Sequence, residues 1–148
     1  MRNVSAGRQL NRDPLGSCRM TVSYQVDREF SLIRTRCAGD VTFAEVKDHF
    51  RELERDASLP ARLDVLIDLT EMQSIPESDQ LKSLVSKVER LQGKLTWGSC
   101  AIVANRDVLF GMSRMFQVFV DAQFVNARVF RKLDEAERWL SSLRSPAA

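Results

Sequence analysis

A chain of 148 residues fits a single domain, since this length can bury a core without disulfides or metals to hold it together. No apolar run is long enough to cross a bilayer, so we expect no integral membrane insertion. The formal charge of +2 is uneven, because residues 1–19 carry four arginines against Asp13 alone and the rest is close to neutral. A nearly neutral folded part argues against a nucleic-acid-binding surface.

Residues 1–19 combine Arg, Ser, Gly, Asn and Pro with few apolar residues, and we expect a disordered tail there. Met20, where a cleanly patterned sequence begins, is a second candidate for the start of the protein. Residues 20–143 are expected to form one domain, and residues 144–148 a disordered C-terminus. The tail lacks the apolar stretch of a signal peptide.

The three cysteines, Cys18, Cys37 and Cys100, have no disulfide-framework or metal-site spacing. Our interpretation of Cys37 and Cys100 is that they are small buried hydrophobic residues. Free thiols suit a reducing compartment, so we expect a cytoplasmic protein.

Residues 21–26 and 30–37 alternate between apolar and polar, and a three-residue link predicts an antiparallel hairpin. The charged side of the second strand suggests that the hairpin lies near a sheet edge. Thr42 and Glu45 then form a capping box that begins an amphipathic helix, which ends before Pro60.

The near-continuous apolar run of Leu63, Val65, Leu66 and Ile67, closed by Asp68, is typical of a central parallel strand buried on both faces. A polar turn over residues 70–79 leads into a second amphipathic helix, which Gly93 ends.

Another apolar run, residues 97–104, predicts the next strand, and Asn105 is a plausible N-cap for a helix from Asp107 to Ala122. A short strand over residues 127–130 and a helix over residues 134–143 follow. The element order is ββαβαβαβα. It predicts an α/β fold with a mixed, mostly parallel sheet of about five strands and about four helices.

Catalytic and cofactor motifs are scarce. The lone histidine, His49, borders the apolar stripe of its helix and is interpreted as a surface or half-buried residue rather than a base. No Gly-rich loop joins a strand to a helix, and no His, Cys and carboxylate cluster has metal-ligand spacing. We therefore expect neither an enzyme nor a bound cofactor or metal.

The first candidate site is the turn before the second predicted helix, because partners of open α/β sheets bind at the carboxyl ends of the strands. Its residues are Asp68, Ser74, Glu77, Ser78 and Asp79. A serine there could receive a phosphate favoured by the helix dipole. The alternative is that Ser74 or Ser78 simply caps the helix and Asp68 is a turn residue.

The helix over residues 107–122 is the second candidate, because apolar side chains cover more than half of its circumference. A helix packed on one face of a sheet needs a narrower apolar stripe than this. The additional apolar side chains would have to be covered by another helix, a second subunit or an apolar ligand. Phe110 lies among the polar side chains of the opposite side. The residues proposed for a ligand or interface are Phe110, Met112, Met115, Phe116 and Phe119.

The element order, the sequence Asp68-Leu69-Thr70, and the segment Ile75 to Leu81 resemble the STAS domains of bacterial anti-sigma-factor antagonists. The resemblance is closer to the SpoIIAA-like group of small bacterial proteins, on Ala101–Val103, on Phe110–Phe116 and on the closing segment from Val129 to Leu140. It covers roughly residues 20–143.

The resemblance implies a non-enzymatic domain that regulates or docks, and related folds also hold nucleotides or lipids. Antagonists of this type carry an Asp-Ser pair whose serine is the phosphorylation switch. Pro76 and Glu77 stand at those positions here, with Ser78 one residue later. A switch at Ser78 is therefore in doubt, and Glu77 would supply a permanent negative charge instead.

Two functions follow as hypotheses. A regulatory or scaffolding module would bind a protein partner, or a second copy as a homodimer, through the turn and the adjacent helices, with Phe110 on the exterior. A carrier or sensor of an apolar molecule or lipid would instead enclose an apolar cavity of at least ~300 Å³ beside residues 107–122, lined by Met112, Met115, Phe116 and Phe119.

Overall fold

The computed structural model describes residues 4–6 and 21–144. Its elements are, in chain order, β1 (Val4–Ala6), β2 (Val22–Asp27), β3 (Leu32–Gly39), α1 (Phe43–Arg55), β4 (Arg62–Met72), α2 (Ser78–Leu91), β5 (Thr96–Val103), α3 (Asp107–Val120), β6 (Asn126–Phe130) and α4 (Leu133–Leu143). The predicted order ββαβαβαβα is confirmed from β2 to α4. The remainder of the predicted tail, and residues 145–148, lie outside the described residues.

The strands form one sheet in the order β1-β2-β3-β4-β5-β6. The pairs β1–β2 and β2–β3 are antiparallel, and β3 to β6 are parallel. The sheet is therefore mixed and mostly parallel, as predicted. The short strand β1 is a sixth strand, which was not predicted because it lies in the segment expected to be a disordered tail. It forms the edge of the sheet, so β2 is one position in from that edge.

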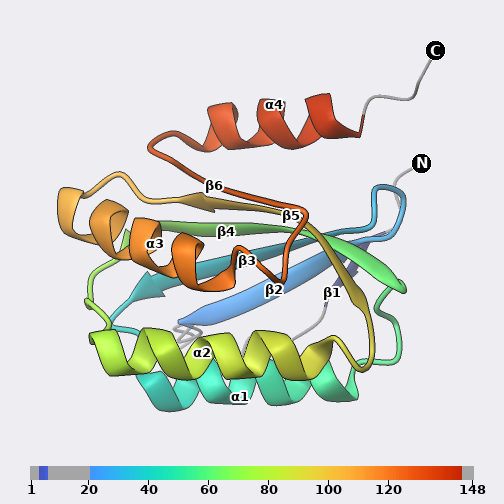
Figure 1. Cartoon of the computed structure of the whole chain (residues 1–148), viewed down its shortest axis with the longest axis horizontal. Coiled ribbons are helices and arrows are strands. Elements are labelled where there is room, and N and C mark those ends of the chain that lie inside the picture. The colour runs from blue at the N-terminus through green and yellow to red at the C-terminus, as the bar shows by residue number, and fades with distance from the viewer. Residues whose placement is uncertain (1–3, 7–20, 145–148) are drawn as a thin grey trace, which may run out of the picture.

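Three helices lie on one face of the sheet, and α4 lies on the other (Figure 1). Each parallel connection steps to the next strand in the same direction. Because such crossovers are right-handed, α1, α2 and α3 are placed on the same side. Among the described elements the chain changes to the other face of the sheet after β6, so α4 is the one described helix on that face.

The two faces have separate cores. On the face of α1, α2 and α3, Trp97 packs against Phe124 with ring centroids 5.3 Å apart, and its indole N–H donates to the Val88 carbonyl oxygen at 2.9 Å. On the α4 face, Phe130 packs against Trp139 at 5.4 Å. Strand β5 is buried over almost its whole length, as a strand covered on both faces must be.

The capping box of α1 is confirmed, since the Glu45 amide donates to Thr42 Oγ1 at 3.2 Å and the Thr42 amide donates to Glu45 Oε1 at 2.9 Å. Two other expected caps are wrong. Glu77, not a serine, is the N-cap of α2, where its amide donates to Gln80 Oε1 at 2.9 Å. Arg106 takes the place expected for Asn105, and α3 ends at Val120, two residues early.

Strand β4 continues beyond its apolar run to Met72, so Asp68 is a strand residue and not a turn residue. Pairing with β3 sustains this extension, since Ala38 and Gly39 lie opposite Glu71 and Met72 after a register shift. Polar side chains there are tolerated because partners satisfy them: Glu71 forms an ion pair with Arg36 of β3.

Candidate functional site

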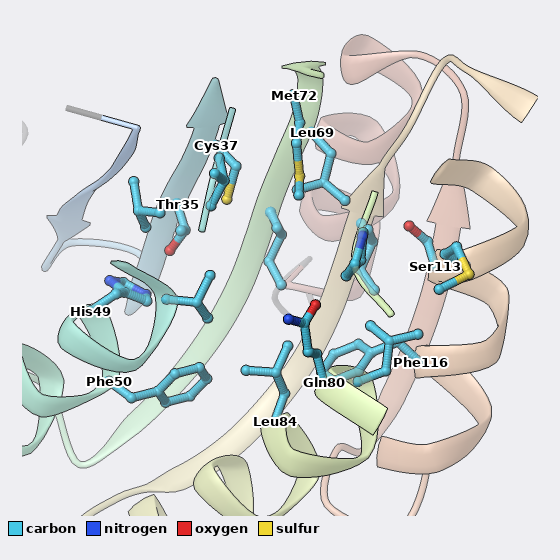
Figure 2. A pocket seen from close by; sticks show the side chains of 18 of the residues that line it. Thr35, Cys37, His49, Phe50, Leu69, Met72, Gln80, Leu84, Ser113 and Phe116 are labelled. Atoms are coloured by element: carbon cyan, nitrogen blue, oxygen red, sulfur yellow. The ribbon is translucent and has the colours of Figure 1, made fainter. Parts of the chain in front are cut away.

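A cavity of about 450 Å³ lies between α1, α2, α3 and the face of the sheet that they cover (Figure 2). Strands β2, β3, β4 and β5 form its floor, and the turn between β4 and α2 contributes to its wall. Protein cores contain few voids larger than a water molecule, whereas ligand pockets span roughly 300–1,000 Å³. A cavity of this size can hold a small molecule.

Apolar side chains make up most of the wall. Phe50 of α1, Leu84 of α2 and Phe116 of α3 reach it from different helices, and Leu69 and Met72 of β4 line the floor (Figure 2). The other apolar side chains from the helices are Phe43, Val46, Leu53, Leu81, Val88, Leu109 and Met112. Such a lining favours an apolar ligand.

Polar side chains are distributed over different parts of the cavity wall. Thr35 and His49 are at the α1 end, Ser113 is at the α3 end, and Gln80 lies between them (Figure 2). The expectation of a surface or half-buried His49 is wrong, because the side chain is 6% exposed. Its ring meets Tyr24 and Phe50 edge-on, with centroids 5.3 and 5.6 Å apart.

Thr35, His49, Gln80 and Ser113 were not among the predicted site residues. A signal existed for two of them. Thr35 lies on the same side of its strand as Ile33, two residues before it, and His49 is three residues after the inward-facing Val46. Ser113 is a polar residue at a buried position of α3, and its residue type gave no indication of burial.

Cys37 also lines the cavity. Burial, with a smaller contribution from the negative charge of Asp68, raises the pKa of this thiol from 9.0 to about 12. The thiol is therefore protonated at neutral pH, which makes it a poor nucleophile. Cys37 accordingly contributes a small, uncharged side chain to the wall.

The predicted turn residues divide between the cavity and the surface. Glu77 contributes to the wall, whereas Ser78 and Asp79 are exposed on the first turn of α2 and do not line the cavity. Ile75 and Pro76, which were not predicted, line it with Glu77. The turn thus has one side toward the cavity and another toward solvent.

Asp68 and Ser74 have structural partners. Asp68 Oδ1 accepts hydrogen bonds from the amide and the hydroxyl of Thr70, at 2.9 and 2.7 Å. Ser74 Oγ lies 2.9 Å from both the amide nitrogen and the carbonyl oxygen of Val41. Ser74 therefore fastens the turn to the segment before α1 instead of capping α2.

The predicted apolar residues of α3 are likewise divided. Met112 and Phe116 line the cavity. Met115 is 38% exposed, and Phe119 is half-buried outside the cavity wall. The prediction of a wall formed by all four side chains is therefore half correct.

The prediction that Phe110 lies on the exterior is wrong. Its ring is half-buried and packs against two of the core clusters. The guanidinium of Arg131 covers it, with the central carbon 4.2 Å from the ring centroid. Arg131 is held there by an ion pair with Asp107 at 2.6 Å. The helix is rotated so that Phe110 and Ser113 face inward.

Over the described residues, no group of three or more His, Cys, Asp or Glu side chains could hold a metal ion. Within that same part of the chain, none of the helices has the length and apolar character required to span a membrane.

Comparison with known proteins identifies the fold. The SpoIIAA-like family model matches residues 32–141, which is most of the sequence. The chain belongs to the SpoIIAA-like family. A solved structure supports the fold: an uncharacterized protein of the DUF3478 family from Shewanella loihica, with a SpoIIAA-like fold. It is 14% identical, with a TM-score of 0.52, and the alignment covers 95% of each chain.

No curated protein matches the sequence significantly. The SpoIIAA-like fold suggests a regulatory domain, and this fold family is generally non-enzymatic.

Proposed function

We propose that this SpoIIAA-like domain binds an apolar small molecule or lipid in the cavity, as a carrier or sensor rather than as an enzyme. The cavity itself carries the proposal, since its volume of about 450 Å³ exceeds what a carrier of this kind requires. The inward position of Phe110 adds support, because a docking module was expected to present this ring to a partner.

The distribution of side chains favours an elongated ligand. The apolar middle of the cavity, bounded by Leu69, Met72 and Leu84, would surround a hydrocarbon portion. Thr35 and His49 at one end offer hydrogen-bonding groups for a polar headgroup. A medium-chain fatty acid or a similar amphipathic molecule combines these features.

Trp97 provides a direct readout, because it lines the cavity while Trp139, the second tryptophan, lies on the opposite face of the sheet. In a Trp139→Phe background, titration with decanoic acid should change the fluorescence of Trp97 in a saturable way. Native mass spectrometry of the protein as purified should show a retained species of lipid-like mass.

A cavity-filling variant provides the control. Val46→Phe with Leu84→Phe adds volume to the wall and should weaken the response at least ~10-fold. The matched variant Leu143→Phe adds volume at an exposed position of α4 and should leave it unchanged. The proposal would be contradicted if native mass spectrometry showed the protein without any retained molecule and if neither decanoic acid nor apolar dyes gave a saturable change in fluorescence.

A second candidate function is docking of a protein partner at the turn between β4 and α2. Its specific support is Ile75, an apolar side chain 47% exposed beside the exposed charges of Glu77 and Asp79. A photoreactive group at position 75 should crosslink one defined protein in the cells of origin. The same group at position 143, equally exposed, should not.

A further inference from the structure

Helix α3 presents an apolar stripe to solvent, on the side away from the sheet. The exposed positions of the helix are Asp107, Val108, Gly111, Arg114, Met115 and Val118. Val108 is 51% exposed and Val118 is 72% exposed. Ala122, just beyond the helix, is exposed as well.

The spacing of this stripe is that of a helix-pairing seam. Val108, Gly111, Met115, Val118 and Ala122 are separated by three, four, three and four residues, which are the a and d positions of a heptad repeat. Buried Ser113 falls at the position opposite the seam. The seam is thus formed by residues that the fold of one chain leaves exposed.

Gly111 gives a second indication. A glycine inside a helix is less favourable than alanine by about 1 kcal/mol. A Cβ atom at position 111 would meet nothing within 4 Å, so packing within the chain does not require a glycine there. A small residue in the middle of a seam allows a second helix to approach closely.

The charges beside the seam indicate that the second helix belongs to another copy of this chain. Positions 107, 114 and 121 flank the seam on one side and hold Asp, Arg and Asp. Asp107 is already paired with Arg131. Arg114 and Asp121 are exposed and form no hydrogen bond or ion pair within the described residues.

We propose that α3 pairs antiparallel with α3 of a second copy, with Met115 against the partner's Val118 and Arg114 beside the partner's Asp121. A two-fold axis repeats each contact, so the pairing satisfies both charges of each chain. A second antiparallel register, in which the two helices overlap along their whole length, would instead place Arg114 next to Arg114 of the second copy, and the two positive charges would repel. The charges therefore select both the orientation and the register.

This dimer does not depend on a ligand, and sedimentation velocity of the full chain over a concentration series tests it. The wild type should sediment as a dimer that dissociates on dilution. Val118→Glu should be monomeric. Arg114→Asp and Asp121→Arg should each weaken the dimer at least ~10-fold. Lys82→Asp, a matched change on the exposed surface of α2, should have no effect.

Mixing provides the decisive result. The Arg114→Asp chain is acidic at both positions and the Asp121→Arg chain is basic at both, so an equimolar mixture should form a heterodimer. A parallel pairing would not be rescued in this way. A wild type that stays monomeric at all concentrations, or reversals that leave the dimer unchanged, would overturn the proposal. Circular dichroism of each variant confirms that it is folded.

Discussion

The hydroxyl of Ser74 bonds both backbone polar groups of Val41, accepting from the amide and donating to the carbonyl oxygen, each at 2.9 Å. Val41 is buried, and the two residues belong to the segments that follow the neighbouring strands β4 and β3. One side chain therefore joins two turns at the carboxyl edge of the sheet, beside the cavity.

Ser74→Ala should lower the free energy of unfolding by about 1–3 kcal/mol, because it leaves buried backbone groups without partners. Urea denaturation provides the measurement. Ser78→Ala, at an exposed position four residues later, serves as control and should change stability by less than ~0.5 kcal/mol. Equal effects of the two substitutions would mean that the Ser74 contact is not stabilising.

Thr42→Ala should destabilise the protein by about 1 kcal/mol, since the α1 amide at Glu45 loses its capping oxygen. Thr42→Ser keeps the hydroxyl and should stay close to the wild type in the same thermal melt. An unchanged melting curve for Thr42→Ala would rule out a stabilising cap.

Phe110→Ser should lower the melting temperature, with a loss of about 2 kcal/mol that reflects partial burial of the ring. The aromatic contact with Arg131 is lost as well. Val118→Ser removes an apolar side chain from the exposed face and should cost little in the stability of the single chain. If Phe110→Ser left the melting temperature unchanged, the inward orientation of this side chain would be contradicted.

Gly98→Ala should be among the more damaging small substitutions, at about 2 kcal/mol or more. A Cβ at this position would collide with Oδ1 of buried Asp64 and lie 2.8 Å from Arg62 Nη2. The carboxylate would have to leave the Ser99 amide, which donates to it at 2.8 Å. At Gly93 a Cβ would make an ordinary contact, so Gly93→Ala is the control for chemical denaturation.

Stability should fall as pH rises above 9. Burial raises the pKa of the Cys100 thiol from 9.0 to about 12. Between those values the unfolded chain loses a proton from Cys100 that the folded chain keeps, so this thiol makes alkali favour unfolding by up to ~1.4 kcal/mol per pH unit. Cys37, whose pKa is raised in the same way, acts in the same direction. Below pH 9 this stabilisation is fully present.

Urea denaturation at pH 8, 9 and 10 measures this dependence, and Cys100→Ala should reduce its slope. The cavity left by Cys100→Ala lowers stability equally at every pH, so the slope is the informative quantity. If the free energy of unfolding fell with pH at the same slope in both proteins, the raised pKa of Cys100 would be contradicted.

The sequence predicted the order of elements because apolar periodicity, together with the turn and cap residues between segments, separates strands from helices. The end of β4 was missed, since Thr70 and Glu71 are polar and only pairing with β3 keeps them in a strand. The orientation of α3 was missed for a related reason. Its apolar residues cover so much of the helix that a helical-wheel projection cannot decide which part faces the sheet.

The cavity could be predicted only in part. Met112 and Phe116 belong to the apolar surplus of α3, and that surplus did indicate a space or a partner beside the helix. His49 and Thr35 come from segments far away in the sequence, and only the folded chain brings them to the same wall. The surplus also contained two separate features, a cavity lining and an exposed seam, which the sequence alone could not distinguish.

The two faces of the sheet differ in packing, since one core contains the cavity and the other does not. This difference affects how the sequence of such a domain can change in evolution. On the α4 face, Ala136 and Leu140 fill a closely packed cluster, where a change in size opens a void or creates a clash. A cavity wall has no fixed volume to fill, so residues such as Leu84 can change in size at a smaller cost in folding. New ligand preferences can therefore evolve on one side of the sheet while the other side preserves the fold.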